Sequence, residues 1–383
     1  MFGRMETTSE LRRTPLHGAH RALGARLIEF GGWDMPVQYT SIVDEHHAVR
    51  RAAGMFDISH MGEAWVRGPG AEAFLNSALT NDVRRLGVGQ AQYTLMCRDD
   101  GGVVDDLYVY RTGAEEFLLV INASRADVDV AWLQGRLAGF QGGRAEVEDA
   151  SGALAAVAVQ GPAAAAFIAH VFPGPSGGGM AAGSVVDLKK NELGRWPWGG
   201  TDAWVARTGY TGEDGFEVVV PAEGVESLWN RLLEAGRPHG LVPAGLGARD
   251  TLRTEMGYPL YGHELDEATT PIEAGLGYFV SLEKGPFAGR EVLARQKGEG
   301  VARKCVAFRM TGRSAPPRPG YTVWAGGEKA GLVVSGTQSP SLGTGIGMAY
   351  VSPALATPGT ALEIEIRGTR HPAEVSRKPL YRK

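Results

Sequence analysis

The sequence predicts an α+β protein of two or three domains that ends in a small all-β module. Its 383 residues exceed the roughly 100 to 200 residues of a typical single domain. Strand and helix patterns occur together up to about Arg303, after which short strands with frequent Gly and Pro replace any long helical period. Hydrophobic residues make up 43% and charged residues 21%, which is typical of a folded globular chain and not of a disordered one.

The composition argues against several classes of function. Lys and Arg number 39 against 43 Asp and Glu, a net charge of -4, so no global positive field exists to hold a nucleic-acid backbone. No apolar run reaches the roughly 18 residues of a membrane span, and the first residues lack the pattern of an export signal. Cys97 and Cys305 are too few for a disulfide framework or a cysteine-rich metal site, so we expect a reduced, cytosolic protein without a bound metal.

The N-terminal half predicts an antiparallel sheet accompanied by helices. Residues 42–53 form an amphipathic pattern, and Gly54 is placed to cap that helix at its C-terminus. Strand patterns follow at residues 62–67, 92–96, 104–111 and 116–121, and helix patterns begin at Gly68 and at Ala123, the second ending near Leu137. This order of strands and helices is typical of an α+β unit.

The rest of the chain divides at a segment rich in Pro and Gly, residues 173–183, which we expect to be a loop or hinge. Strand patterns near residues 203–206 and 216–220 precede a helix pattern at 224–235. From about Arg303 the strands KCVAFRM, GYTVWA, KAGLVVSG and ALEIEIRG predict a small all-β module, a barrel or a jelly roll.

The segment GGVVDDLYVYR, residues 101–111, carries a pair of carboxylates at the start of a strand. Because side chains alternate along a strand, Asp105 and Asp106 should face opposite sides, so that one can be solvated while the other enters a pocket formed by aromatic neighbours. Carboxylates at a strand start are also common turn caps. The residues alone leave these two interpretations open.

A second candidate site combines RTGYTGEDGFE, residues 207–217, with a helix that carries Arg249 and Asp250. Glu217 and Arg249 would either form a structural ion pair or belong to an aromatic pocket with one arginine. Such a pocket suits a flat heterocycle that has amide-like donors and a carboxylate tail.

Two sequence features that contain histidine have an ordinary structural explanation. His60 follows a buried-looking MFDI segment, and a single His there is more often a hydrogen-bonded loop residue than a catalytic one. Residues 44–47 (DEHH) lack the spacing of a zinc site, so we expect a solvated helix face there. The chain also lacks a Walker loop and a complete dinucleotide-binding fingerprint.

Longer motifs run nearly from end to end of the chain. They are RRTPLHGAH (12–20), FGGWDMPVQY (30–39), GMFDISHMG (54–62), GGVVDDL, GYTGEDGFE, GLGARDTLR, YGHELDE (261–267), TTPIEAGLGYFV (269–280) and SGTQSPSLGTGIGMAYV (335–351). In these motifs and in their order the chain resembles the glycine cleavage system T-protein family, which are tetrahydrofolate-dependent aminomethyltransferases.

The resemblance implies a three-domain cloverleaf around a central folate channel. The first domain would be discontinuous and folate-binding, made of residues 1–55 and about 150–275. An α+β domain with an antiparallel sheet would span about 56–149, and a C-terminal β-barrel domain about 285–383.

The resemblance also implies the reaction. Proteins of this family take the one-carbon unit of an S-aminomethyl-dihydrolipoyl arm, carried by the lipoylated H-protein, and transfer it to tetrahydrofolate. The products are 5,10-methylene-tetrahydrofolate, ammonia and dihydrolipoyl H-protein. Tetrahydrofolate and H-protein are therefore the expected partners, together with the other glycine cleavage proteins indirectly, and no nucleic acid, membrane or metal is expected.

Site residues carry over from the family by position. The second aspartate of the Asp-Asp pair, Asp106, would be the catalytic residue. The folate-binding residues would be Met61, Tyr93, Asn122, Tyr210, Glu217, Arg249, Tyr258 and Arg382, the last on a loose alignment of the C-terminal end. Relatives of the same fold include folate-dependent demethylases and a non-catalytic folate-binding accessory protein. These are the alternatives, and the retained Asp106 argues against a purely binding role.

Overall fold

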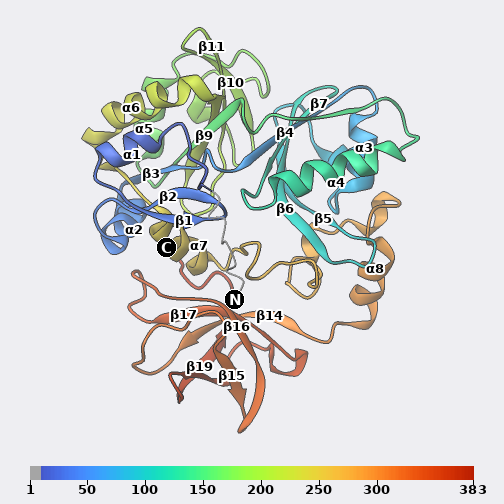
Figure 1. Ribbon diagram of the computed structural model, residues 1–383, viewed down its shortest axis with the longest axis vertical. Coiled ribbons are helices and arrows are strands. Elements are labelled where there is room, and N and C mark those ends of the chain that lie inside the picture. The colour runs from blue at the N-terminus through green and yellow to red at the C-terminus, as the bar shows by residue number, and fades with distance from the viewer. Residues whose placement is uncertain (1–9) are drawn as a thin grey trace, which may run out of the picture.

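The computed structural model describes residues 10–383 as three lobes, two built on open sheets and one on a closed barrel. Figure 1 shows the two sheet lobes side by side, with the barrel below them. This arrangement confirms the predicted α+β fold, three-lobed with a C-terminal all-β module. Among residues 10–383, no helix is long and apolar enough to cross a membrane.

The first lobe is a six-stranded sheet in the order β10-β11-β12-β9-β3-β13. Its centre is made from distant parts of the chain, since β3 lies antiparallel to β9 and parallel to β13. Helices cover both faces: Phe167 and Trp229 pack on one face, and Val49 and Leu252 pack on the other. A two-stranded hairpin, β1-β2, lies beside this lobe. The elements are α1 (His17–Ala22), β1 (Arg26–Phe30), β2 (Trp33–Gln38), α2 (Ile42–Arg51), β3 (Ala53–Asp57), β9 (Leu154–Gln160), α5 (Ala164–Val171), β10 (Leu193–Trp198), β11 (Thr201–Ala206), β12 (Gly215–Pro221), α6 (Val225–Gly236), β13 (Leu241–Pro243) and α7 (Leu246–Met256).

The second lobe is an antiparallel five-stranded sheet in the order β5-β6-β7-β4-β8, with two helices on one face. The opposite face packs against the first lobe, where Trp65 and Tyr110 share a buried cluster with Leu193 and Ala206. Each strand therefore has one face on the helices and one on the neighbouring lobe. The elements are β4 (Gly62–Arg67), α3 (Ala71–Ala78), β5 (Ala91–Cys97), β6 (Val103–Gly113), β7 (Glu116–Ile121), α4 (Ala126–Ala138) and β8 (Glu146–Asp149).

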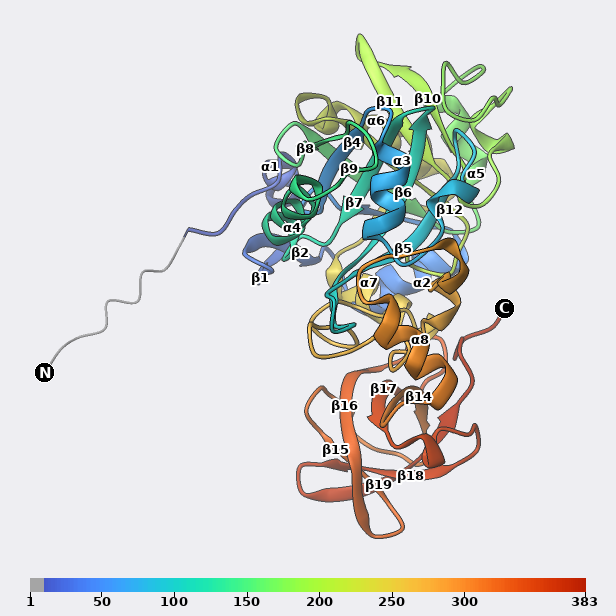
Figure 2. The ribbon, with the colours of Figure 1, turned by 90° about the vertical axis from the view of Figure 1, so that its right-hand side faces the viewer.

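The third lobe is a barrel closed in the order β14-β17-β16-β15-β18-β19, so no strand edge in it is left unpaired. Helix α8 (Arg290–Glu299) precedes it, and after β19 the chain runs back from the barrel toward α7, as Figures 1 and 2 show. The strands are β14 (Lys304–Met310), β15 (Thr322–Ala325), β16 (Glu328–Gln338), β17 (Gly345–Val351), β18 (Ala361–Ile366) and β19 (Thr369–Ser376).

The local predictions hold best for amphipathic elements. The strand at 62–67 is confirmed at both ends, and the predicted helices are confirmed within a few residues. The proposed cap Gly54 is wrong: α2 ends at Arg51, and Gly54 is a buried residue of β3. A Cβ atom there would lie 2.4 Å from Val49 Cγ2, so glycine is needed for the close approach of helix and strand.

The domain boundaries remain a prediction; strand β3 of the six-stranded sheet crosses the expected boundary at residue 55, whereas the other strands lie inside the expected ranges.

The helix face at residues 44–47 also differs from its prediction. Glu45 and His46 are buried, not solvated. Glu45 accepts hydrogen bonds from the backbone N–H groups of Tyr39, Thr40 and Gly245, and the His46 ring is bonded to Thr251 and Ser341. Among residues 10–383 no group of three or more His, Cys, Asp or Glu side chains is arranged to hold a metal ion. Glu45 and His46 therefore connect α2 to the segments that carry Tyr39, Thr40, Gly245, Thr251 and Ser341.

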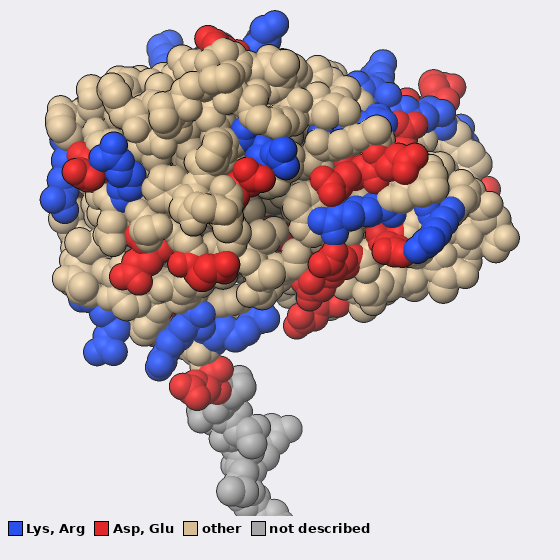
Figure 3. Space-filling view, turned by 90° about the horizontal axis from the view of Figure 1, so that it is seen from above, with Lys and Arg blue, Asp and Glu red and all other residues tan. Residues whose placement is uncertain are grey.

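The surface carries charges of both signs. Seen from above, Lys and Arg alternate with Asp and Glu over the two sheet lobes, and neither sign forms a continuous field (Figure 3). This pattern agrees with the near balance of charges in the sequence.

A buried ionic cluster joins the first lobe to the barrel and to the C-terminal tail. Arg50 Nη1 lies 2.9 Å from Glu213 Oε1, and Arg50 Nη2 lies 2.7 Å from Glu255 Oε2. Glu255 also accepts hydrogen bonds from Ser339 and Ser341 of the barrel lobe, and its carbonyl accepts the N–H groups of Leu380 and Tyr381. Arg50 thus bridges two buried carboxylates where three segments meet, and each carboxylate has a further partner, Lys383 on Glu213 and His46 on Glu255.

We expect Arg50→Met to lower the free energy of unfolding by about 3 to 5 kcal/mol, since it removes the buried cation that Glu213 and Glu255 share. Urea unfolding followed by fluorescence measures this. Arg144→Met is the matched control, because the Arg144 side chain is 81% exposed in its 2.8 Å ion pair with Glu146, and such pairs contribute about 1 kcal/mol or less. Equal effects of the two substitutions would contradict the assignment.

Candidate functional site

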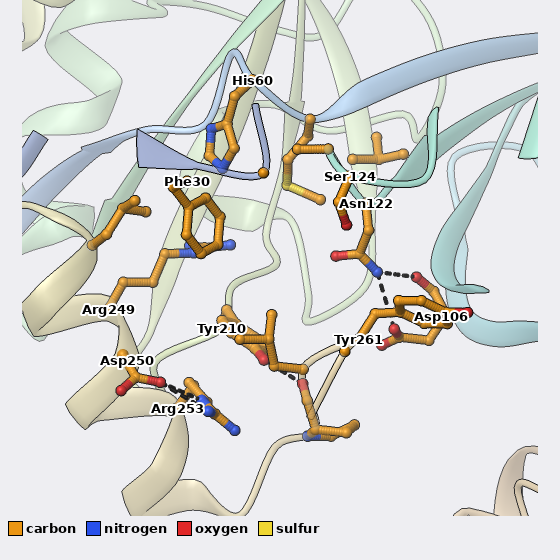
Figure 4. Close-up of a pocket in the computed structure, with 18 of the residues that line it drawn as sticks. Phe30, His60, Asp106, Asn122, Ser124, Tyr210, Arg249, Asp250, Arg253 and Tyr261 are labelled. Carbon is orange, nitrogen blue, oxygen red and sulfur yellow. Dashed lines mark hydrogen bonds and ion pairs between the residues drawn. The ribbon is translucent and has the colours of Figure 1, made fainter. Parts of the chain in front are cut away.

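A cavity of about 590 Å³ lies where the lobes meet, lined by residues from both sheets, from the β1-β2 hairpin, from α7 and from the loop that follows it. Seven of the nine predicted site residues line it: Met61, Tyr93, Asp106, Asn122, Tyr210, Glu217 and Arg249. In Figure 4, Asp106 and Asn122 lie on one side of the cavity, and Phe30, His60 and Arg249 on the other. The fold thus brings together segments that are up to about 190 residues apart in the sequence.

Asp106 is held by two neighbouring side chains. Tyr93 Oη donates a hydrogen bond of 2.8 Å to Asp106 Oδ2, and Asn122 Nδ2 donates one of 3.0 Å to Asp106 Oδ1. Burial, with the nearby charge of Asp105, raises the pKa of Asp106 to about 7. A carboxylate with both oxygens already fixed in direction is ready to meet a ligand group in a defined geometry.

Asp105 lies on the side of β6 that carries Leu107 and Val109, and Asp106 on the cavity side, as the alternation of the strand predicts, although the Asn122 amide reaches both carboxylates. The expectation that one of the pair is solvated is wrong, because Asp105 is fully buried on the face that α3 and α4 cover. Its carboxylate accepts the backbone N–H of Asn122 and, through the other oxygen, the Asn122 side-chain amide, both at 2.9 Å. The turn-cap interpretation does not describe these bonds, since Asn122 is distant in the sequence.

Aromatic rings form much of the wall. Tyr93 and Tyr108 meet edge to face at 6.1 Å, and Tyr210 is fixed by a hydrogen bond from its hydroxyl to the carbonyl of Pro259. Tyr258 stacks on Tyr210 at 5.8 Å and is not among the lining residues, so it supports the wall from behind. Arg382 lies exposed in the C-terminal tail, outside the lining.

Glu217 and Arg249 both line the cavity, and the alternative of a structural ion pair is wrong. Among residues 10–383 no carboxylate oxygen lies within 4.0 Å of an Arg249 side-chain nitrogen, and the buried Nη1 atom has no hydrogen-bond partner. Arg249 instead lies 4.9 Å from the centre of the Tyr210 ring. Glu217 accepts a 2.6 Å hydrogen bond from Thr208 on one oxygen. A cationic and an anionic group thus remain available to a ligand.

His60 was expected to be a hydrogen-bonded loop residue, and this is wrong for its Nδ1 atom. That atom is buried and has no hydrogen-bond partner among residues 10–383, and the ring lies edge to face with Phe30 at 5.8 Å on the cavity wall. Burial, together with the charge of Arg249, lowers the pKa of His60 to about 4. The imidazole is therefore neutral at physiological pH.

Comparison with known proteins decides the family. The model of the GCVT N-terminal domain matches residues 16–284, and that of the glycine cleavage T-protein C-terminal barrel domain matches residues 303–382. The chain belongs to the glycine cleavage T-protein family. The boundary between the two matches agrees with the beginning of the barrel lobe at β14.

Members of this T-protein family are similar along the whole chain. The aminomethyltransferases of Moorella thermoacetica and Geobacillus kaustophilus are each 47% identical, over 98% and 97% of this chain and 99% of each relative. The crystal structure of the glycine cleavage system aminomethyltransferase T from Bartonella henselae has a TM-score of 0.88 at 34% identity, covering 97% of this chain and 98% of that one. The folds therefore agree from end to end.

Several lining residues of this T-protein family member were not singled out from the sequence. They are Phe30, Tyr108, Tyr110, Ser124, Arg253, Tyr261 and His263. Phe30, Arg253, Tyr261 and His263 lie inside motifs that the resemblance used, so a signal was present for these. Tyr108 and Tyr110 follow Asp106 at alternate positions of β6, which puts them on the same face, and this periodicity could have identified them.

The neutral His60 predicts a pH dependence of stability. Its pKa of about 4 in the folded protein lies below the 6.5 of an exposed histidine, so the unfolded chain binds the extra proton between these values. The contribution of His60 is complete above about pH 6.5 and is lost as the pH falls toward 4. We therefore expect wild type to lose about 2 kcal/mol more than His60→Gln between pH 7.5 and pH 5.

Urea unfolding at the two pH values measures this difference. His170→Gln, at an exposed position of α5, is the matched control and should behave like wild type. If His60→Gln loses as much stability as wild type on acidification, the buried neutral imidazole is not the cause.

Proposed function

We propose that this chain transfers the one-carbon unit of an aminomethyl group to tetrahydrofolate inside the described cavity. The observation that carries the proposal is Asp106, a carboxylate fixed by Tyr93 and Asn122 on one wall while Glu217 and Arg249 stay unpaired with each other on the same cavity. The family uses tetrahydrofolate as its substrate. The finer statement, that the cavity of this chain binds it through these residues, is our proposal.

The lining suits the parts of a folate. Tyrosine rings offer flat apolar surface to a pterin, and the free oxygen of Glu217 can accept from its 2-amino and ring N–H groups. Arg249 has a buried donor without a partner, which suits an acceptor or an anionic group of the ligand. Met61 adds to the wall. Tyr258 would act by supporting Tyr210, and we do not extend the binding site to the exposed Arg382.

The chemistry we propose exchanges two bonds at one carbon. The aminomethyl carbon loses its bonds to the lipoyl sulfur and to nitrogen, and forms bonds to N5 and N10 of the folate. The two protons that leave N5 and N10 go to the sulfur and to the departing ammonia, so atoms and charge balance. As the carbon becomes iminium-like, the Asp106 carboxylate would stabilise its positive charge and hold the N5–N10 edge in place.

The donor in this scheme is the S-aminomethyl lipoyl arm of H-protein, and we propose this protein as the macromolecular partner. An arm carried by another protein can react only if the cavity is open to it. The surface carries patches of both charge signs, so H-protein could dock where its own charges are complementary to a local patch. Both cysteines, Cys97 and Cys305, are free and buried, which fits the proposed cytosolic location.

We expect Asp106→Asn to reduce turnover by roughly 100- to 1,000-fold while folate affinity changes much less, because the charge matters chiefly in the transition state. The assay measures ammonia and methylene-tetrahydrofolate formed from aminomethyl-loaded H-protein. Asp100→Asn is the matched control, since the Asp100 side chain is 59% exposed. Near-normal turnover of Asp106→Asn would refute the role of Asp106, and folate binding without any turnover in wild type would favour the accessory protein.

We expect Glu217→Gln to weaken tetrahydrofolate binding by about 1 to 3 kcal/mol, since an amide cannot match two ligand donors as a carboxylate does. Isothermal titration calorimetry with tetrahydrofolate gives the affinity. Glu223→Gln, exposed at the end of β12, is the control and should bind like wild type. Unchanged affinity of Glu217→Gln would mean that the pterin lies elsewhere.

A further inference from the structure

Behind Asp106 lies a second layer of polar groups on the helix-covered face of the five-stranded sheet. Asn122 connects the two faces, because its Nδ2 atom lies 2.9, 3.0 and 3.0 Å from Asp105 Oδ1, the Asp106 carbonyl and Asp106 Oδ1, so that one of its two N–H groups is shared between two acceptors. Its backbone N–H donates to Asp105 Oδ2 at 2.9 Å. The position of the Asn122 amide, and with it one of the two bonds that fix Asp106, therefore depends on Asp105.

Asp129 completes this layer from the first turn of α4. Its side chain is fully buried, and the start of α4 lies against β6, where Arg125 Nε donates to the Val104 carbonyl at 3.1 Å, so the Asp129 carboxyl group faces that of Asp105. Among residues 10–383, no N–H or O–H group of another side chain or of the backbone donates to either Asp129 oxygen. The nearby cation, Arg125, is turned away, with Nη2 2.7 Å from Glu267 Oε1 and Nε donating to the Val104 carbonyl.

Two buried carboxyl groups that face each other require a proton between them. Two anions would repel strongly in a site from which water is excluded, whereas one neutral group can donate its O–H to the other. The two partners are not equivalent, because Asp105 accepts two N–H groups from Asn122 and Asp129 accepts none from the described residues. The negative charge is therefore better stabilised on Asp105, and the proton belongs on Asp129.

We propose that Asp129 is a positioning residue that keeps its proton in the folded protein and donates it to Asp105, so that the Asp105 anion holds Asn122 and, through Asn122, the carboxylate of Asp106. The part of this proposal that concerns turnover rests on the proposed transferase function. Asp129 touches neither the cavity nor a reacting atom, since it lies on the other side of the sheet from Asp106.

The charged and titratable groups around Asp129 support this assignment. They are Asp105 and Asp106 on β6, Arg125 at the start of α4, and the more distant Tyr261 in the loop after α7. Burial and the charge of Asp105 raise the pKa of Asp129 to about 11, and Arg125 only partly opposes this. The same Asp105 charge adds to burial in raising the pKa of Asp106 to about 7. A proton on Asp129 thus allows Asp105 to stay anionic, which in turn raises the pKa of Asp106.

Two substitutions at Asp129 separate proton donation from mere packing. Asp129→Asn keeps an N–H donor for Asp105 at nearly the same volume, whereas Asp129→Ala removes the donor, so that Asp105 must become neutral. Turnover requires the Asp106 anion and is lost as the pH falls through the Asp106 pKa. We expect the acid limb of kcat/KM to stay near pH 7 in wild type and in Asp129→Asn, and to move down by about one pH unit in Asp129→Ala.

The dependence on Asp105 is tested by a double substitution. Asp105→Asn alone should move the acid limb down, because it removes the charge beside Asp106. In that background Asp129→Ala should cause no further shift, since Asp129 acts only through Asp105. An Asp129→Ala shift that persists in full in the Asp105→Asn background, or an equal shift for Asp129→Asn and Asp129→Ala, would overturn the proposal.

A further measurement tests the protonation of Asp129 without an activity assay. At pH 9, where Asp106 is ionised, the infrared difference between folded wild type and Asp129→Asn should show a buried protonated carboxyl band, and the difference between wild type and His170→Gln should show none. The buried Glu63, whose pKa is also raised by burial, contributes equally to all three spectra and cancels. If the band is present and no transfer occurs, the proposed function fails while the proton assignment stands. If Asp129→Asn, shown by thermal melting to be folded, loses no band, the proposal is wrong whatever the activity.

Discussion

The site depends on the register in which β6 pairs with β5 and β7. In this register Leu95 lies opposite Asp106 and Tyr93 lies opposite Tyr108, so the Tyr93 hydroxyl reaches the Asp106 carboxylate diagonally across the strands. A slip of one residue would place Asp106 against the helices and Asp105 in the cavity. The register is secured by the apolar residues of the helix-covered face, among them Val109 and Leu119, which cannot turn outward without losing their buried contacts.

The cavity lies between lobes, so its shape depends on how the lobes are joined. Arg253 shows this most directly, because it lines the cavity and donates to Glu264 at 3.0 Å and to Ser335 of the barrel strand β16 at 2.8 Å. Arg50 and Glu255 make a second connection to the barrel lobe and the tail. The barrel contributes no residue to the cavity lining, yet it fixes the side chains that form the cavity floor. A role for the barrel in positioning, not in chemistry, follows from these contacts.

The sequence predicted residues that line the cavity better than it predicted the contacts around them. The Asp-Asp pair, the Glu217 strand and the Arg249 helix could be read from period and motif, because each lies in a short element whose alternation or helical spacing fixes its side. What could not be read were contacts between distant elements. Strand alternation allows one of the two aspartates to be solvated, and nothing in a single strand reveals that α4 covers Asp105. Gly54 resembles a helix cap in the sequence because its close approach to Val49 is a contact between elements. His60 and Arg249 have unpartnered polar atoms for the same reason, since only the assembled cavity shows which bonds are missing.

The buried carboxyl groups explain why the site needs two layers. Asp106 alone, buried between tyrosines, would tend to take up a proton and lose the charge that the proposed chemistry requires. Hydrogen bonds from Tyr93 and Asn122 favour its anion, while the charge on Asp105 opposes it, and the balance leaves a pKa of about 7. With a pKa near 7, the Asp106 carboxyl group is ionised in a large share of molecules at neutral pH and can stabilise a developing cation. Its anion is only moderately stabilised before the reaction, so the interaction with the cation can be stronger in the transition state than in the ground state. In the proposed proton arrangement Asp105 serves two ends at once, because the same carboxylate accepts from Asn122 and, with burial, raises the pKa of Asp106.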